Sequence, residues 1–289
     1  MVNELKQLQT GLSLCVLKKD APRTATTAYS VSGKHYLAGY VESDTHLLYT
    51  SSEQVALMLA TQSSDYQINR LVTIQESIDP AELVSPITLK IIVDFARRTG
   101  QPIAYTVLDT SGVEVFHADD VNTILSFYAP VTHVLGKVTD AVITTNKTKA
   151  VGDKPKQLKE QALKGVARSF PTYDSASGYG AAVITADGSM YHSGQYSSFE
   201  HRTNVHSEMG AVIAAIMNGQ TQITDIGLVS TKYTDKPCQM CGSCRQFLAE
   251  MSTRFNLDLD IHLFAFSSNQ HESHKLDSYL PKSWTSKRW

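Results

Sequence analysis

Cysteine is scarce in this chain, and its distribution is uneven. Four cysteines occur in 289 residues, and three of them, Cys238, Cys241 and Cys244, lie within one run of seven positions. Cys15 stands alone, so a disulfide framework of the secreted kind is not expected. The cluster indicates a metal site in a reducing compartment instead, and we expect a cytoplasmic protein.

Long apolar runs and an excess of one charge are also absent. No window approaches 18 apolar residues, and polar residues interrupt the first twenty positions, so neither a membrane span nor a signal peptide is expected. The 26 basic and 28 acidic residues give a formal net charge of −2, which does not indicate a nucleic-acid partner. A length of 289 residues exceeds that of a usual single domain.

What the sequence does contain is an internal repeat at an offset of 155 residues. Between positions 33–68 and 188–223, 11 of 36 ungapped positions are identical, among them Glu53 and Glu208. Each copy is expected to begin with a strand hairpin, followed by helices that alternate with strands. The predicted fold class is therefore α/β, with a mixed central sheet flanked by helices in each of two tandem domains.

The second copy carries the clearest local signals. Asp187-Gly188 separates two runs of strand character, which is typical of a hairpin turn. The stretch 242–255 is expected to be helical because its apolar residues recur at helical spacing, namely Cys244, Phe247, Leu248 and Met251. The predicted domains are 1–143, a connecting segment 144–165 and a second domain 166–289.

Basic residues gather in the connecting region and in the tail. Residues 144–168 hold seven Lys or Arg against two acids, and a helix is expected from about Gln157. Such a run is either a solvated linker or a nucleic-acid contact. The tail, with Trp284 and Trp289 beside basic residues, either stacks on a single strand or docks on the core or on a partner subunit.

Metal-ligand chemistry appears in the second copy at two expected helix starts. His206 and Glu208 precede the cysteines by about 35 residues, with a strand expected between them. Two adjacent helix N-termini can direct one imidazole and two thiolates to a single Zn²⁺ and leave the fourth tetrahedral position open. Helix dipoles and zinc both favour the thiolate form of cysteine.

This pattern resembles the cytidine deaminase superfamily, whose signature is H-x-E followed by P-C-x-x-C. "GYGAAVITADG" is similar to the opening hairpin of that family, "HSE" to its ligand and acid, and "CGSCRQFLAE" to its cysteine helix. The resemblance implies a central sheet flanked by helices and one Zn²⁺ cofactor. It also implies that Glu208 is catalytic and moves protons among water, the ring nitrogen and the departing ammonia.

The resemblance leaves two cysteine registers open. "PCQMC" matches the tRNA-adenosine-deaminase form, which would use Cys238 and Cys241, whereas "CGSCRQFLAE" matches the cytidine deaminase form. We predict His206, Cys241 and Cys244 as the metal ligands, with Cys238 as the alternative. Arg245 is expected to donate a hydrogen bond to a ligand thiolate or to lie exposed.

The first copy lacks these ligands. Ser51 stands where His206 does, and "SPITLK" offers no cysteine, so this copy is expected to be a degenerate, structural or substrate-shaping domain. In the second copy the ribose-contacting segment of nucleoside deaminases is replaced by Tyr196 and Ser198, and Glu200 stands nearby. Asn204 is expected either to contact the base or to cap a helix.

Two classes of function follow. The first is a zinc-dependent hydrolytic deaminase of a cytosine-type base in a nucleoside, a nucleotide or single-stranded nucleic acid, with a tRNA-adenosine-deaminase-like RNA editor as its variant. The second is a non-enzymatic zinc-stabilised scaffold, which would need a fourth ligand. A homodimer is the oligomer that we expect, and no membrane partner is expected.

Overall fold

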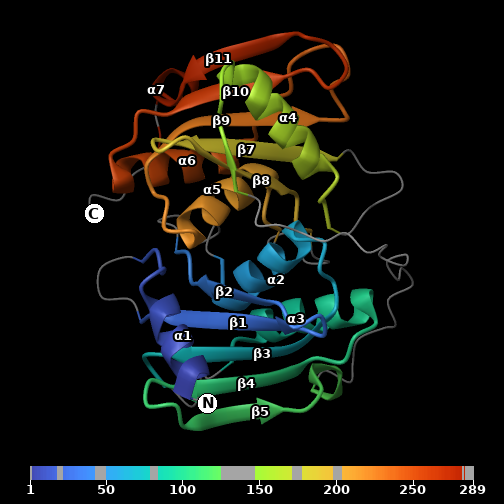
Figure 1. Cartoon of the computed structure of the whole chain (residues 1–289), viewed down its shortest axis with the longest axis vertical. Coiled ribbons are helices and arrows are strands. Elements are labelled where there is room, and N and C mark those ends of the chain that lie inside the picture. The colour runs from blue at the N-terminus through green and yellow to red at the C-terminus, as the bar shows by residue number, and fades with distance from the viewer. Residues whose placement is uncertain are drawn as a thin grey trace. The chain divides into compact units, whose positions relative to one another are not determined.

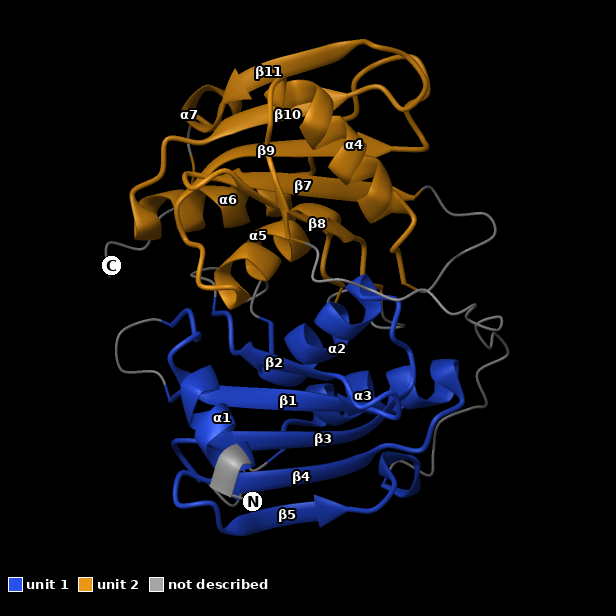
Figure 2. Ribbon diagram, in the orientation of Figure 1, with its two compact units in different colours: residues 1–42, 49–141, 198–203 blue, residues 43–48, 142–197, 204–289 orange. Residues whose placement is uncertain are grey.

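The computed structural model describes residues 2–17, 22–42, 50–78, 84–124, 147–170, 178–197, 204–281 and 283. The chain divides into two compact units (Figure 2). Described residues of the first unit lie within 2–124, and those of the second lie within 147–283. The tail residues Trp284 and Trp289 lie outside the described residues.

The first unit is built around a mixed sheet. Its described strands have the order β2-β1-β3-β4-β5, in which β3 and β4 are parallel and the other neighbours are antiparallel (Figure 1). The elements are α1 (Val2–Leu12), β1 (Thr24–Ser30), β2 (His35–Gly39), α2 (Ser52–Gln62), β3 (Ile68–Gln75), α3 (Pro86–Thr99), β4 (Ala104–Asp109), β5 (Glu114–Ala118) and the 3-10 turn η1 (Val121–Thr123).

The second unit repeats this plan and adds one short strand. Its described strands have the order β11-β10-β9-β7-β8-β6, with β9 and β10 parallel. The elements are β6 (Thr148–Lys149), α4 (Lys154–Val166), β7 (Tyr179–Thr185), β8 (Ser189–Gly194), α5 (Ser207–Met217), β9 (Ile223–Ser230), α6 (Gly242–Phe255), β10 (Asp260–Phe264), β11 (His271–Lys275) and α7 (Leu276–Tyr279).

The two units confirm the internal repeat in three dimensions. β1 and β7, α2 and α5, and β3 and β9 begin and end at an offset of 155 residues, whereas α3 and α6 begin at an offset of 156. Gly33 and Gly188 occupy matching hairpin turns with φ of 82° and 77°, a left-handed conformation that favours glycine. The predicted α/β class and the mixed sheets flanked by helices are confirmed.

Helix α4 covers one face of the second sheet, and α5 and α6 cover the other (Figure 1). Helix α4 lies very close to strands β7 and β8. A Cβ on Gly180 would lie 2.1 Å from the Ala162 carbonyl oxygen, and one on Gly194 would lie 2.4 Å from the Gly165 carbonyl oxygen. Only glycine fits at these two strand positions. Leu158 and Ala162 of α4 pack there in an apolar cluster of the core.

The basic segment that precedes and forms α4 is tied to the second unit. Lys149 Nζ donates to the Asp187 carbonyl oxygen at 2.7 Å, and Lys159 Nζ donates to the Ser268 carbonyl oxygen at 2.6 Å. Lys154 Nζ lies 3.1 Å from the buried Asp225 carboxylate. The helix begins at Lys154, three residues before the predicted start, because Asp153 caps its first turn. At least three of the seven basic side chains therefore bind within this unit.

Buried His192 of β8 makes the stability of the second unit dependent on pH. The side chain is 6% exposed, and neither ring nitrogen has a hydrogen-bond partner among the described residues. Burial first, and then the charges of Arg168 and Lys164, lower the pKa of His192 to about 4. Since the unfolded chain binds the proton near pH 6.5, stability is full above that pH and falls as the pH drops toward 4.

We expect His192→Leu to remove this pH dependence. Leu37 occupies the matching position in β2, so leucine suits the strand. Between pH 7 and 4.5 the wild-type unit should lose about 2 to 3 kcal/mol more of its free energy of unfolding than the variant does. Urea unfolding of both proteins at several pH values measures the difference, and parallel stability curves would contradict the assignment.

Candidate metal centre

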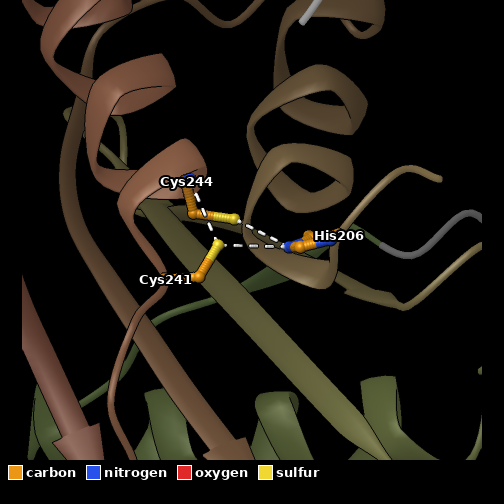
Figure 3. Close-up of side chains that lie close together, drawn as sticks. All are labelled: His206, Cys241 and Cys244. Carbon is orange, nitrogen blue, oxygen red and sulfur yellow. Dashed lines mark hydrogen bonds between the residues drawn. The ribbon is translucent and has the colours of Figure 1, made fainter. Parts of the chain in front are cut away.

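His206 directly precedes the first residue of α5. It is the N-cap of the helix, with φ −68° and ψ 155°, but its side chain makes no capping hydrogen bond. The following helix is buried along all of its eleven residues, so the position of its N-terminus is fixed by the core. The imidazole is therefore available for contacts outside its own helix (Figure 3).

Cys241 and Cys244 come from the start of α6. Cys241 is the N-cap residue, and its sulfur accepts a hydrogen bond from the Cys244 backbone N–H at 3.5 Å. The apolar face predicted from the sequence is buried, namely Cys244, Phe247, Leu248 and Met251. Packing of this face fixes the helix, while the exposed Cys241 lies at its open end.

The three side chains converge. His206 Nδ1 lies 3.4 Å from the sulfur of Cys241 and 3.4 Å from that of Cys244 (Figure 3). All three candidate ligand atoms lie within 4.8 Å of one another. A tetrahedral zinc ion with usual Zn–N and Zn–S bonds would separate nitrogen and sulfur by about 3.6 Å. The donor types and their spacing therefore fit zinc and leave one position open.

The pKa of Cys241 also favours the binding of a metal cation. The pKa of Cys241 is lowered to about 3, chiefly because the Cys244 thiol donates to it and His206 adds a second donor. The bond to Cys241 raises the pKa of His206. A thiolate is therefore favoured at Cys241, and the thiolate is the form in which cysteine binds a metal.

Glu208 lies two residues beyond His206, in the first turn of α5. Its side chain is 4% exposed and accepts a hydrogen bond from Ser207 Oγ at 3.0 Å. Burial raises the pKa of Glu208 above its ordinary value. A buried carboxyl beside the cluster can take up and release a proton without exchange with bulk solvent.

Cys238 lies apart from the cluster. Its sulfur donates to the Leu228 carbonyl oxygen at 3.1 Å, and its backbone N–H donates to the Phe264 carbonyl oxygen at 3.2 Å. Burial raises the pKa of this thiol to about 12. Among the described residues, the group with metal-ligand spacing contains Cys241 and Cys244 but not Cys238.

The other predicted residues are not part of the cluster, as far as the described residues show. Tyr196 is 1% exposed, and its ring stacks on Phe170 at 5.4 Å, which makes it part of the core. Its backbone pairs with Val205, next to the half-buried Asn204. Ser198 and Glu200 lie outside the described residues. The hydrogen bond predicted from Arg245 to a ligand sulfur is not formed, because Arg245 Nη1 donates to the Tyr279 carbonyl oxygen at 3.5 Å.

In the first unit, the position that matches the metal centre holds a different set of hydrogen bonds. Ser51 caps α2 where His206 begins α5, and its hydroxyl accepts from the Gln54 backbone N–H. Glu53 is buried as Glu208 is, but it accepts hydrogen bonds from Thr73 at 3.0 Å and from the Tyr105 hydroxyl at 2.8 Å. The matching positions in the second unit are Leu228 and Ile261, which offer no side-chain donor.

The two carboxyls have different neighbours. In the first unit the hydroxyls of Thr73 and Tyr105 donate to Glu53, whereas in the second unit apolar side chains stand at those positions and Glu208 accepts a hydrogen bond from Ser207. Sequence comparison of the two copies missed Thr73 and Tyr105. The sequence does hold a signal for them, because these two positions carry hydroxyl groups in the first copy and apolar side chains in the second.

We expect the purified chain to bind one zinc ion, because the ligand set occurs once among the described residues. Elemental analysis after gel filtration measures the ratio of zinc to protein. A ratio near one that falls close to zero in His206→Ala is the expected result. Two tightly held zinc ions per chain would contradict this account of the first unit.

Comparisons with known proteins point to the same region. Residues 153–255 match the family model described as the cytidine and deoxycytidylate deaminase zinc-binding region. A cytidine deaminase of Haemophilus ducreyi is 30% identical over 105 residues, which are 36% of this chain and 32% of that protein. One of Pasteurella multocida is 35% identical over 107 residues, which are 36% and 31% of the two chains. The match thus spans about a third of each relative.

Solved structures of cytidine deaminases are similar as well. The enzyme of Burkholderia pseudomallei aligns with 22% identity and a TM-score of 0.40, over 45% of this chain and 98% of its own. That of Mycobacterium tuberculosis aligns with 20% identity and a TM-score of 0.38, over 47% and 100%.

The matched region runs from the start of α4 to the end of α6, and it contains His206, Glu208 and both cysteines of the cluster. The second unit of this chain therefore contains a region that matches the zinc-binding region of the cytidine and deoxycytidylate deaminases.

Proposed function

We propose that the chain is a zinc-dependent hydrolytic deaminase of a cytosine-type base. The observation that carries this proposal is that three protein donors, and no fourth among the described residues, converge beside a buried carboxyl. Structural zinc sites are normally closed by four protein ligands, whereas catalytic sites keep one position for water or substrate. The named activity of both curated relatives supports the same reaction class.

In this proposal His206, Cys241 and Cys244 would hold a zinc ion, which would supply Lewis-acid chemistry that makes water a nucleophile at neutral pH. Glu208 accepts the proton released by water and delivers it to the ring nitrogen beside the reacting carbon. It then transfers a proton to the departing amine, so that cytosine and water become uracil and ammonia.

The scaffold alternative would need a fourth protein ligand. Cys238 is the nearest candidate in sequence, but its thiol donates to the Leu228 carbonyl oxygen in the interior. Recruiting it would break that hydrogen bond and expose a buried acceptor, which costs about 1 to 3 kcal/mol. This supports a site with an open position, and hence the enzyme.

We infer that the substrate is a free cytosine nucleoside or nucleotide. The relatives are named cytidine deaminases, which supports cytosine over adenine. Three lysines of the basic segment are engaged with Asp187, Asp225 and Ser268, which leaves fewer of them for a nucleic-acid backbone. In the described part of the chain no helix is long and apolar enough to cross a membrane.

Turnover on cytidine and deoxycytidine is expected to exceed turnover on single-stranded oligonucleotides, and to change little between low and high salt. A polymeric substrate would bind through phosphate contacts, so its rate would fall steeply as salt rises. Ammonia release measured on both substrate types at two salt concentrations separates the cases. Salt-sensitive deamination of oligonucleotides alone would replace the nucleoside with a nucleic acid.

A further inference from the structure

The four residues from Cys238 to Cys241 connect the buried thiol to the exposed candidate ligand. Cys238 anchors one end, through its backbone and side-chain hydrogen bonds to Phe264 and Leu228. Cys241 forms the other end as the N-cap of α6. The position of the Cys241 sulfur therefore depends on what holds Gln239 and Met240 between these two ends.

Tyr279 of the short helix α7 holds this middle section. Its hydroxyl donates to Gln239 Oε1 at 3.1 Å and accepts the Met240 backbone N–H at 3.4 Å. Met240 is 3% exposed, so its amide needs a partner from the protein interior. One hydroxyl group thus fixes two consecutive residues of the cysteine segment.

Tyr279 also touches the far side of the cysteine pair. The Arg245 guanidinium lies 5.2 Å from the centre of the Tyr279 ring, and Arg245 Nη1 donates to the Tyr279 carbonyl oxygen. Arg245 directly follows Cys244, and its backbone N–H donates to the Cys241 carbonyl oxygen at 3.1 Å. Contacts from one tyrosine therefore reach the residues on both sides of the two thiols.

The tyrosine is itself held by the sheet. Its ring stacks on His274 of β11, with centroids 5.0 Å apart and the planes 24° apart. Leu276, at the start of α7, is 4% exposed, and its backbone N–H donates to the Leu259 carbonyl oxygen. The edge strand β11 and helix α7 thus form a rigid support for the Tyr279 side chain.

We propose that Tyr279, with Arg245, is a positioning residue for the metal centre, because it holds Cys241 and Cys244 in the arrangement that faces His206. This inference rests on the proposed zinc function of that site. Ordering a loop residue costs conformational entropy, and a segment that is already ordered does not incur that cost when it binds. Loss of the support should therefore weaken zinc binding although every ligand remains.

The test uses three variants of the full chain. Tyr279→Phe removes the hydroxyl but keeps the ring under Arg245, Tyr279→Ala removes both, and Tyr233→Phe is a matched control in the loop that leads to Cys238. Zinc affinity is measured by competition with a chromophoric chelator. We expect the affinity to fall about three- to tenfold in Tyr279→Phe and about 10- to 100-fold in Tyr279→Ala. The control should match the wild type.

A second readout separates positioning from general stability. The thiolate-to-metal absorption band of the cobalt-substituted protein reports the geometry around the sulfurs, which loss of stability alone would not change. We expect the band to shift or weaken in Tyr279→Ala and to recover most of its wild-type form in Tyr279→Phe. If Tyr279→Ala does not fold, the Phe variant still tests the hydroxyl alone.

The outcomes distinguish this inference from the proposed function. If the wild-type chain binds zinc and both Tyr279 variants keep its affinity and cobalt spectrum, the positioning role is wrong and the metal site stands. A wild-type chain that binds no zinc would overturn the proposed function, and this inference with it.

Discussion

Glu208→Gln is expected to retain zinc and fold while losing nearly all deaminase turnover. Glutamine keeps the shape of the side chain, and its amide oxygen can still accept the hydrogen bond from Ser207. It cannot accept and release a proton, however, and general acid–base catalysis contributes about 10²- to 10⁴-fold in rate. Because Glu208 acts in several proton transfers in this mechanism, kcat should fall at least that far while the zinc content stays near one.

The repeat supplies a matched control for this variant. Glu53→Gln changes the same residue type at the same repeat position, but in the first unit its donors are Thr73 and Tyr105. We expect it to lower the free energy of unfolding by about 1 to 2 kcal/mol and to leave kcat unchanged. Near-normal turnover in Glu208→Gln would remove this carboxyl from the mechanism.

Cys244→Ala should lose most of its zinc, whereas Cys238→Ala should keep it. The Cys244 sulfur lies 3.4 Å from His206 Nδ1, while that of Cys238 donates to the Leu228 carbonyl oxygen. Loss of one of three protein ligands leaves a two-ligand site, and the variant should also lose the stability that zinc binding gives to the folded chain. Zinc analysis and thermal unfolding of both variants, with and without added zinc, measure these effects.

The same pair of variants decides between the two cysteine registers. Cys238→Ala removes a buried donor, so a modest loss of stability that added zinc does not restore is expected. Full zinc loss in Cys238→Ala, with retention in Cys244→Ala, would support the tRNA-adenosine-deaminase-like pair instead. That ranking would also require the segment before α6 to adopt a different conformation from the one described.

The hairpin and the cysteine helix could be predicted closely from sequence because their signals are local. The turn at Asp187-Gly188 has the left-handed glycine that the dipeptide predicts, and α6 spans the predicted range 242–255. Burial of its apolar face followed from spacing alone. The internal repeat added the topology, since a second copy of the same pattern requires a second sheet of the same order.

The edge strands β5 and β11 were not predicted. β11, with the sequence HESHK, has neither alternating apolar residues nor β-branched side chains, because an edge strand exposes most of its surface and is stabilised by one neighbour. Helix α1 was not predicted either, although Leu5, Leu8 and Leu12 recur at helical spacing, because that segment was interpreted only for what it lacks.

Contacts between segments far apart in the chain could not be predicted from the sequence either. Tyr279 lies about 40 residues from Gln239 and Met240, and the sequence does not indicate that α7 folds back onto them. Arg245 was expected either to bond to a ligand sulfur or to lie exposed, and its guanidinium instead contacts the Tyr279 ring and donates to the Tyr279 carbonyl oxygen. Residue type indicates that Arg245 donates hydrogen bonds, and only the fold determines which group accepts them.

The measurement that tests the central claim most directly is removal and restoration of zinc in the wild-type chain, with turnover of cytidine followed throughout. The purified protein should convert cytidine to uridine and ammonia, lose that activity as a chelator removes one zinc ion per chain, and regain it on addition of zinc. A chain that carries its single zinc ion and deaminates neither cytidine nor deoxycytidine nor cytosine in single-stranded DNA or RNA would contradict the account. So would turnover that survives complete removal of the metal.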